Sequence, residues 1–270
     1  MAAAPQIAPK DFICLRYIVQ DGVALATLNR PERRNALNPR AYAEVEAAFR
    51  AATADDAVRC MVVTGADPAF CSGEDVKEMM TGEKREPSAT PAQPRATPAA
   101  MAALDCTKPV IAAVNGAAMG WGMELALFAD IRIASDRASF AELFIKRGLI
   151  SDVGGLLRLP AIVGPAKAAE LLFTGDPVDA KEALRIGLVS DVVQHGELLP
   201  RVMALASRIA ANPPLALTAM KEGLRKTSYG DPQEIGAWAI AQIYRLFQTE
   251  DHREGVKSFL EKRPPVFKGR

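Results

Sequence analysis

The chain has 270 residues, enough to bury a large hydrophobic core in one or two domains. Its 33 basic and 32 acidic residues nearly cancel, which argues against charge-driven binding to nucleic acid or to an anionic membrane. Hydrophobic residues make up 49% of the sequence, as in a globular protein, and no apolar run reaches the length of a membrane span. We therefore expect a globular protein without nucleic-acid or membrane partners.

The first third of the chain predicts strands followed by helices. Residues 1–10 lack the pattern of a secretion signal and are expected to form a flexible tail. Residues 12–20 and 23–28 indicate a β-hairpin, and residues 39–52 predict an amphipathic helix capped by Asn38. Further apolar runs that predict strands follow at residues 58–64, 110–114 and 131–134. Strands that alternate with helices favour a layered α/β core.

Residues 81–98 differ in composition from the rest of the chain. They hold four prolines among charged and small polar residues and show no apolar period. We expect a mobile loop, which is either a tolerated insertion or a flap over a binding pocket.

The chain becomes helical after about residue 154. Apolar residues recur at helical spacing in residues 167–173, 180–186, 198–211, 214–226, 234–248 and 254–262, with a brief strand at 189–193. This pattern predicts a core over residues 11–200 and a helical C-terminal region over 201–270. Helices this apolar also predict an oligomer.

The cysteines and histidines of the sequence give no indication of a metal site, a disulfide framework or a catalytic triad. The four cysteines form no CxxC pair and have no histidine nearby, so we expect no metal site and no disulfide framework, and a reducing, cytoplasmic setting is favoured. The two histidines, His195 and His252, lie in a turn-like stretch and in a highly charged stretch. A Ser-His-Asp triad is therefore not favoured.

Two glycine-rich junctions carry the strongest chemical signal. Residues 114–126 hold three glycines between a strand-like run and a helix that contains Glu124. Such a turn leaves backbone N–H groups free at a helix N-terminus, which suits a phosphate or an oxygen that becomes negative. No complete GxGxxG or GxxxxGK motif is present, and tight helix–strand packing is the alternative.

The second junction, residues 68–79, also passes from a strand through a glycine, Gly73, into a helix. Two such junctions on neighbouring strands would aim two N–H groups at one point. A thioester carbonyl that turns into an enolate requires that arrangement.

Several stretches match one family together. They are residues 29–37 (NRPERRNAL), 69–75 (AFCSGED), 108–116 (KPVIAAVNG), 129–134 (ADIRIA), 172–175 (LFTG), 183–189 (ALRIGLV) and 254–263 (EGVKSFLEKR). They resemble the crotonase superfamily, whose best-known members are the enoyl-CoA hydratases and isomerases, and the resemblance runs from about residue 12 to residue 268.

The resemblance implies an α/β fold, a spiral of ββα repeats with a helical C-terminal trimerisation region, assembled as trimers or as hexamers of paired trimers. It implies an acyl-CoA thioester substrate and no cofactor, with coenzyme A forming part of the substrate. The backbone N–H groups of Glu74 and Trp121 match the family's oxyanion-hole donors. The residues that match or neighbour the coenzyme A contacts are Arg34, Ala36, Asp75, Lys77, Phe259 and Lys262.

The catalytic residues match the family only in part. Glu124 matches the first of the hydratase's two glutamates, and it follows Trp121 by roughly one helical turn. Burial would raise its pKa and the helix N-terminus would lower it, and the sequence does not decide between them. Phe144 stands in the place of the second glutamate, where it would line the substrate pocket. Glu142, two residues earlier in a strand-like segment, is one candidate substitute.

Asp152 is the other candidate, because its turn is similar to the aspartate-containing turn of dienoyl-CoA isomerases. Related turns occur in ring-opening isomerases of phenylacetate breakdown, carnitinyl-CoA dehydratases and 4-chlorobenzoyl-CoA dehalogenases. In the structural alternative, Asp152 caps a helix that starts near residue 154. We predict Glu124 and Asp152 as an acid–base pair in an enoyl-CoA hydratase/isomerase-type enzyme.

Three alternatives stay open at this point. The first is a dienoyl-CoA isomerase-like shift of a double bond without hydration. The second is a catalytically weak family member that binds CoA or RNA. The third is a dehalogenase or thioester hydrolase with Asp152 as the nucleophile, which is disfavoured because the family's dehalogenases pair that aspartate with a histidine and residues 1–194 contain none.

Overall fold

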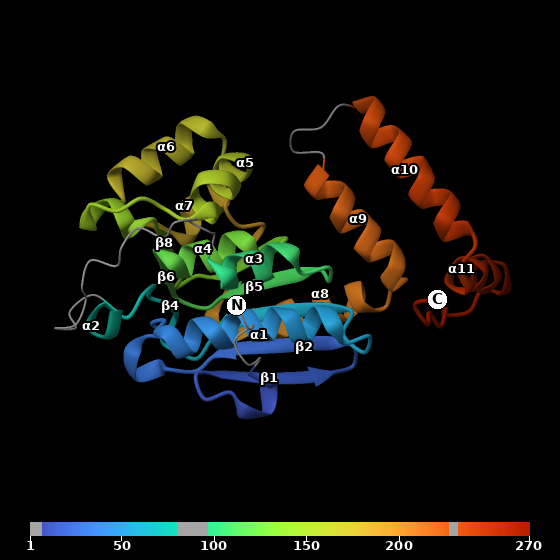
Figure 1. Ribbon diagram of the computed structural model, residues 1–270, viewed down its shortest axis with the longest axis horizontal. Coiled ribbons are helices and arrows are strands. Elements are labelled where there is room, and N and C mark those ends of the chain that lie inside the picture. Colours follow the sequence, from blue (N-terminus) through green and yellow to red (C-terminus); the bar gives the residue numbers. More distant parts are fainter. Residues whose placement is uncertain (1–6, 80–96, 227–231) are drawn as a thin grey trace, which may run out of the picture.

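The computed structural model describes residues 7–79, 97–226 and 232–270, and it places an α/β core beside a group of C-terminal helices (Figure 1). The larger sheet has six strands in the order β1-β2-β3-β5-β7-β10. These are β1 (Leu15–Gln20), β2 (Val23–Leu28), β3 (Cys60–Gly65), β5 (Val110–Val114), β7 (Ile131–Ser135) and β10 (Asp191–Val193). The hairpin of β1 and β2 is antiparallel, as predicted, and the remaining neighbours are parallel.

A smaller sheet lies beside the first, with the strand order β4-β6-β8-β9. Its strands are β4 (Ala69–Cys71), β6 (Ala117–Met119), β8 (Ser139–Ala141) and β9 (Val178–Asp179). Consecutive strands alternate between the two sheets, since β3, β5 and β7 of the large sheet lead into β4, β6 and β8 of the small one. The parallel pairing of β4 with β6 brings the two glycine-rich junctions side by side.

The helices follow the strands in chain order. They are α1 (Pro39–Ala54), α2 (Val76–Met79), α3 (Pro98–Asp105), α4 (Trp121–Phe128), α5 (Leu159–Val163), α6 (Pro165–Thr174), α7 (Ala180–Arg185), α8 (Leu198–Ala210), α9 (Pro214–Lys226), α10 (Pro232–Phe247) and α11 (Glu250–Glu261). Short 3-10 turns occur at η1 (Pro9–Asp11), η2 (Pro31–Arg33), η3 (Leu143–Arg147) and η5 (His195–Glu197), and η4 (Gly154–Arg158) is a π-helical turn. The predicted cap of α1 is confirmed, because the Asn38 side chain accepts a hydrogen bond from the backbone N–H of Ala41 at 2.9 Å.

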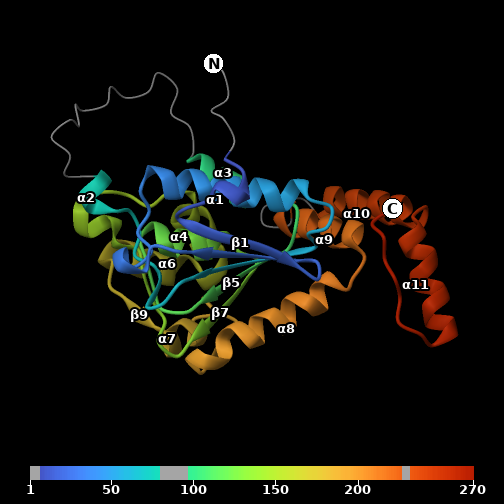
Figure 2. The ribbon, with the colours of Figure 1, turned by 90° about the horizontal axis from the view of Figure 1, so that it is seen from below.

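The central strands β3 and β5 of the large sheet are buried on both faces, so they are almost continuously apolar. In β3, Met61 and Val63 belong to the main core with α1, α3 and α4, whereas Cys60 and Val62 pack against α8. Figure 2 shows α1 and α8 on opposite sides of the sheet. The boundary predicted at residue 200 therefore falls inside a helix that covers the sheet, and the division into domains stays a prediction.

One local expectation is wrong, and two others are mostly untested. The strand-like interpretation of residues 139–149 fails, because β8 ends at Ala141 and residues Leu143–Arg147 form the 3-10 turn η3. Glu142 and Phe144 therefore do not share the face of one strand. The predicted tail and mobile loop lie mostly outside the described residues, except that η1 begins at Pro9 and the last loop residue, Pro98, begins α3.

Helices α9, α10 and α11 extend away from the sheets (Figures 1 and 2). They expose large apolar side chains, including Met220, Leu224, Ile240, Tyr244, Phe247, Phe259 and Leu260. Among the described residues, no helix combines the length and the apolar character needed to cross a membrane.

Candidate active site

The two glycine-rich junctions pack backbone against backbone. Gly73 and Gly120 have positive φ values of 89° and 52°, a conformation that a side chain would strain. A Cβ atom at Gly73 would lie 2.6 Å from the carbonyl oxygen of Met119 and 3.5 Å from the backbone nitrogen of Trp121. Only glycine allows this approach, and the approach places the amides at Glu74 and Trp121 in neighbouring turns.

These turns open into a cavity of about 430 Å³. Its lining residues are Tyr42, Glu74, Met79, Thr97, Trp121, Phe144, Ile150, Ser151 and Asp152. Four predicted site residues, namely Glu74, Trp121, Phe144 and Asp152, thus lie around one space. The Trp121 ring forms the wall and makes edge-to-face contacts with Tyr42 at 4.8 Å and Phe128 at 5.9 Å between centroids.

Asp152 is held in this cavity by side-chain donors. Its Oδ2 accepts a hydrogen bond from Thr97 Oγ1 at 2.6 Å and a longer one from Trp121 Nε1 at 3.4 Å. Its Oδ1 accepts from the backbone N–H of Val153, the residue before η4, rather than from the first turn of that helix. The carboxylate is therefore positioned by groups that line the cavity, and the helix-cap alternative does not account for its contacts.

Glu124 lies behind the cavity wall and is completely buried. Its Oε1 accepts a hydrogen bond from the backbone N–H of Gly155 at 3.0 Å, while Oε2 has no hydrogen-bond partner among the described residues. Burial raises the pKa of Glu124 to about 7, with the charge of Asp152 adding to the rise and the backbone of Gly155, Gly154 and Asp152 opposing it. The sequence leaves open whether burial or the helix N-terminus decides the pKa of Glu124, and burial is the larger effect.

A second buried carboxyl group lies next to Glu124. Glu142 is 1% exposed, its Oε2 accepts a hydrogen bond from Ser151 Oγ at 3.0 Å, and its Oε1 has no partner among the described residues. Burial, followed by repulsion from Glu124, raises the pKa of Glu142 to about 8. The sequence marks Glu142 only as a candidate substitute for the second glutamate. It does not mark Ser151, Thr97 or Tyr42 at all, because these residues belong to no motif.

The turn around Arg34 and Ala36 packs beside the first junction. Arg34 is left-handed, with φ of 51°, and its carbonyl oxygen accepts the backbone N–H of Ser72. Arg30 bonds the Ala36 carbonyl oxygen at 2.7 Å and pairs with Asp75 at 3.2 Å. Asp75 is therefore engaged in holding this turn. Lys77 lies on the exposed side of α2, in the same part of the molecule.

Phe259 and Lys262 lie elsewhere. They belong to α11 and its C-terminal cap, at the opposite end of the molecule from α2 in both views (Figures 1 and 2). The Phe259 side chain is 81% exposed. Within one chain, these two predicted coenzyme A contacts do not reach the cavity.

The comparisons with known proteins agree over almost the whole chain. The family model described as "Enoyl-CoA hydratase/isomerase" matches residues 19–270. A crotonyl-CoA hydratase from Syntrophomonas wolfei is 37% identical over 92% of this chain and 95% of its own length, and a 2,3-dehydroadipyl-CoA hydratase from Escherichia coli is 39% identical over 93% and 97%. A solved structure of an enoyl-CoA hydratase subunit I from Geobacillus kaustophilus superposes with a TM-score of 0.86 at 36% identity, over 96% and 99% of the two chains.

The chain belongs to the enoyl-CoA hydratase/isomerase family. The predicted crotonase-type fold is confirmed, and so is the prediction of an enzyme of this acyl-CoA-metabolising family. Within this family, the residue at position 144 bears on the reaction, because the resemblance places the second hydratase glutamate there. In this member of the family a phenylalanine lies against the Gly120 turn, where its ring would be 3.8 Å from a Cβ atom.

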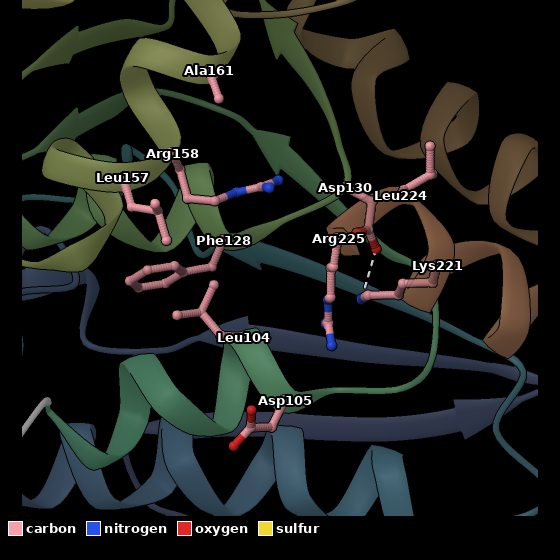
Figure 3. A pocket seen from close by; sticks show the side chains of 10 residues that line it. All are labelled: Leu104, Asp105, Phe128, Asp130, Leu157, Arg158, Ala161, Lys221, Leu224 and Arg225. Atoms are coloured by element: carbon pink, nitrogen blue, oxygen red, sulfur yellow. Dashed lines mark ion pairs between the residues drawn. The ribbon is translucent and has the colours of Figure 1, made fainter. Parts of the chain in front are cut away.

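A second cavity, of about 390 Å³, is lined by Phe128 together with residues of α9 such as Lys221 and Arg225 (Figure 3). Its charged groups are used in attaching α9 to the core. Lys221 is 5% exposed, pairs with Asp130 at 2.7 Å and donates to the carbonyl oxygen of Lys108 at 2.6 Å. Arg225 donates to the carbonyl oxygen of Cys106 at 2.8 Å. We regard this cavity as part of the packing between α9 and the core.

Proposed function

We propose that this protein adds water to the double bond of a 2-enoyl-CoA thioester, with Glu124 and Asp152 as the acid–base pair. The main-chain N–H groups of Glu74 and Trp121 hold the thioester oxygen as it gains negative charge. The observation that carries the proposal is the close packing of the Gly73 and Gly120 turns, because preorganised amide donors in a site shielded from water stabilise an enolate strongly.

In this proposal, the proton movements follow from where the two carboxyl groups lie. A carboxyl group with a pKa near 7 exchanges protons readily at neutral pH, and the pKa of Glu124 is raised to about 7. Ionised Glu124 takes a proton from water as the hydroxyl oxygen adds to the β-carbon, and this proton is then passed to the α-carbon of the enolate, which returns Glu124 to its ionised form. Asp152, which lines the cavity, orients that water and takes part in the second transfer.

The relatives support hydration. A crotonyl-CoA hydratase, a 2,3-dehydroadipyl-CoA hydratase and a carnitinyl-CoA dehydratase are all 37% to 39% identical to this chain. We extend the shared chemistry, addition or removal of water at a CoA thioester, to this protein. The acyl group itself is not part of the proposal.

Double-bond isomerisation is the second candidate, and Phe144 favours it. With a phenylalanine in place of the second hydratase glutamate, Glu124 and Asp152 could remove a proton from one carbon and return it to another. Incubation with crotonyl-CoA and with a 3,5-dienoyl-CoA separates the two reactions, since hydration removes conjugated absorbance and isomerisation shifts it. No turnover of either ester would contradict both candidates.

The nucleophilic alternative for Asp152 has less support. The two histidines do not line the cavity, since His195 pairs with Asp67 at 3.0 Å and His252 lies on α11. A dehalogenase or thioester hydrolase of this kind predicts a trapped acyl-enzyme on Asp152, which intact mass spectrometry detects after rapid acid quench.

We propose further that the enzyme works as a trimer or a pair of trimers. The exposed apolar side chains on α10 and α11 support burial against another copy. In that assembly, Phe259 and Lys262 of a neighbouring protomer would cover the coenzyme A that Arg34 and Ala36 hold. Sedimentation gives the oligomeric state, and Phe259→Ser should raise KM for the CoA ester with little change in kcat. The four cysteines are buried free thiols, in keeping with a cytoplasmic setting.

A further inference from the structure

Three buried groups behind the cavity form a connected cluster. Glu142, between β8 and η3, receives a hydrogen bond from Ser151. Glu124, on α4, receives one from Gly155. A Cβ atom at Gly155 would lie 2.6 Å from Ser151 Oγ and 3.2 Å from Glu124 Oε1, so both side chains press on the same glycine. The cluster thus brings together two carboxyl groups from different elements of the fold, one on α4 and one after β8.

Each carboxyl group leaves one oxygen unsatisfied. Glu124 Oε2 and Glu142 Oε1 are buried and have no hydrogen-bond partner among the described residues. Leaving a buried carboxylate oxygen without a donor destabilises the fold. A single proton on Glu142, donated towards Glu124 directly or through one water, would satisfy both oxygens.

The charges around Glu142 agree with a retained proton. The titratable group whose charge acts on it is Glu124 from α4, and Asp152, from the loop before η4, acts on Glu124 in turn. On its outer side, Lys146 of η3 pairs with Asp176 at the surface. No cation among the described residues pairs with the Glu142 carboxyl group. Glu124 accepts a backbone N–H from Gly155, whereas Glu142 accepts only the Ser151 hydroxyl, so Glu124 ionises first and Glu142, whose pKa burial and repulsion raise, keeps its proton to higher pH.

We propose that Glu142 is a positioning residue that keeps its proton at neutral pH and donates it to Glu124. In this role Glu142 holds Glu124 ionised and correctly oriented. It thereby replaces part of the function of the second hydratase glutamate, whose place Phe144 occupies. Ser151 sets the geometry by binding the other oxygen of Glu142. The inference rests on the proposed function, in which Glu124 is the acid–base residue, and it names no further substrate contact.

The test is the pH profile of kcat for the turnover of a short enoyl-CoA ester. The wild-type profile should rise as Glu124 loses its proton and fall about tenfold per pH unit once Glu142 loses its own, near pH 8. Glu142→Gln keeps a donor that cannot ionise, so the alkaline fall should disappear, with kcat at neutral pH lowered only a few-fold. Glu142→Leu removes the donor, so kcat should drop about 10- to 100-fold and the acid limb should move to higher pH.

Ser151→Ala is a second, independent test of the alkaline limb of the pH profile. Its hydroxyl stabilises ionised Glu142, so its loss should move the alkaline limb of the profile to higher pH. Glu170→Gln, on the surface of α6, is the matched control and should leave the profile unchanged. An alkaline limb that persists in Glu142→Gln, or a profile that all three cluster variants leave unmoved, overturns the proposal.

Infrared spectroscopy separates this inference from the proposed function. The free wild-type enzyme should show a protonated carboxylic acid band that titrates near pH 8 and is absent in Glu142→Gln, in which only the band of Glu124, titrating near pH 7, remains. The band does not depend on any substrate. If the enzyme shows this band but turns over no enoyl-CoA ester, the proposed function is refuted and the proton on Glu142 is still supported. Turnover without the band refutes the inference alone.

Discussion

Substitution of Gly154 by alanine tests whether the position of Glu124 controls the reaction. A Cβ atom at residue 154 would lie 2.1 Å from Glu124 Oε2 and 3.2 Å from Phe128 Cε1. Ordinary contact begins at 3.4 Å, so the carboxylate oxygen has to move by about 1.3 Å. A displacement of about 1 Å at a reacting group costs roughly 100-fold in rate, and we expect kcat to fall by about that factor.

The stability of the same variant should change much less. The φ of Gly154 is not in the left-handed region, so alanine introduces no backbone strain there. Overpacking costs about 1–3 kcal/mol, which corresponds to a drop of roughly 2–4 °C in Tm for each kcal/mol in a domain of this size. A large loss of kcat with a small loss of Tm separates misplacement of Glu124 from misfolding.

The assay is the loss of conjugated absorbance of crotonyl-CoA, measured with circular dichroism melts of the same preparations. Gly196→Ala is the matched control, because a Cβ atom there meets nothing within 4 Å, and it should behave as the wild type. A Gly154→Ala enzyme whose kcat stays within about twofold of wild type would refute the assignment of Glu124 as a reacting group.

Four further substitutions test the remaining assignments. Asp152→Asn should lower kcat by about 100- to 10,000-fold with little change in KM, whereas Thr97→Val, which removes one donor to Asp152, should cost only about tenfold; equal effects in steady-state kinetics would contradict this order. Phe144→Glu places a carboxyl group in the cavity and should raise hydration relative to isomerisation, measured as the ratio of the two products; an unchanged ratio would speak against Phe144 as the residue that sets the outcome. Lys221→Met leaves Asp130 without its buried cation and should destabilise the fold by about 3–5 kcal/mol in urea unfolding, and a loss below about 1 kcal/mol would show that this pair does not hold α9 to the core.

Local signals in the sequence predicted much of the fold. The hairpin of β1 and β2, the Asn38 cap and the buried strands β3, β5 and β7 depend on short-range pattern, and the structure has them all. The two glycine junctions were predictable for the same reason, since positive φ and close backbone contact demand glycine. The same pattern predicted that the amides of the two junctions meet at one point, and the family resemblance identified the donors as Glu74 and Trp121.

Other features depend on contacts between distant segments. The burial of Glu142 follows from the way the loop before η4 folds over the end of β8, and hydrophobic periodicity does not report such a contact. Thr97 reaches Asp152 across 55 sequence positions, so no local pattern marks it. The pKa of Glu124 is another such case, because burial by the surrounding chain outweighs the helix N-terminus.

The catalytic amides proposed here belong to residues whose side chains, Glu74 and Trp121, form part of the cavity wall. Every residue except proline carries the same backbone N–H, so these two positions can change their side chains and keep the same donors. Divergence at Glu74 and Trp121 would then reshape which acyl groups fit while the chemistry at the thioester stays constant. One scaffold could in this way acquire new substrates by single substitutions at its own reaction centre.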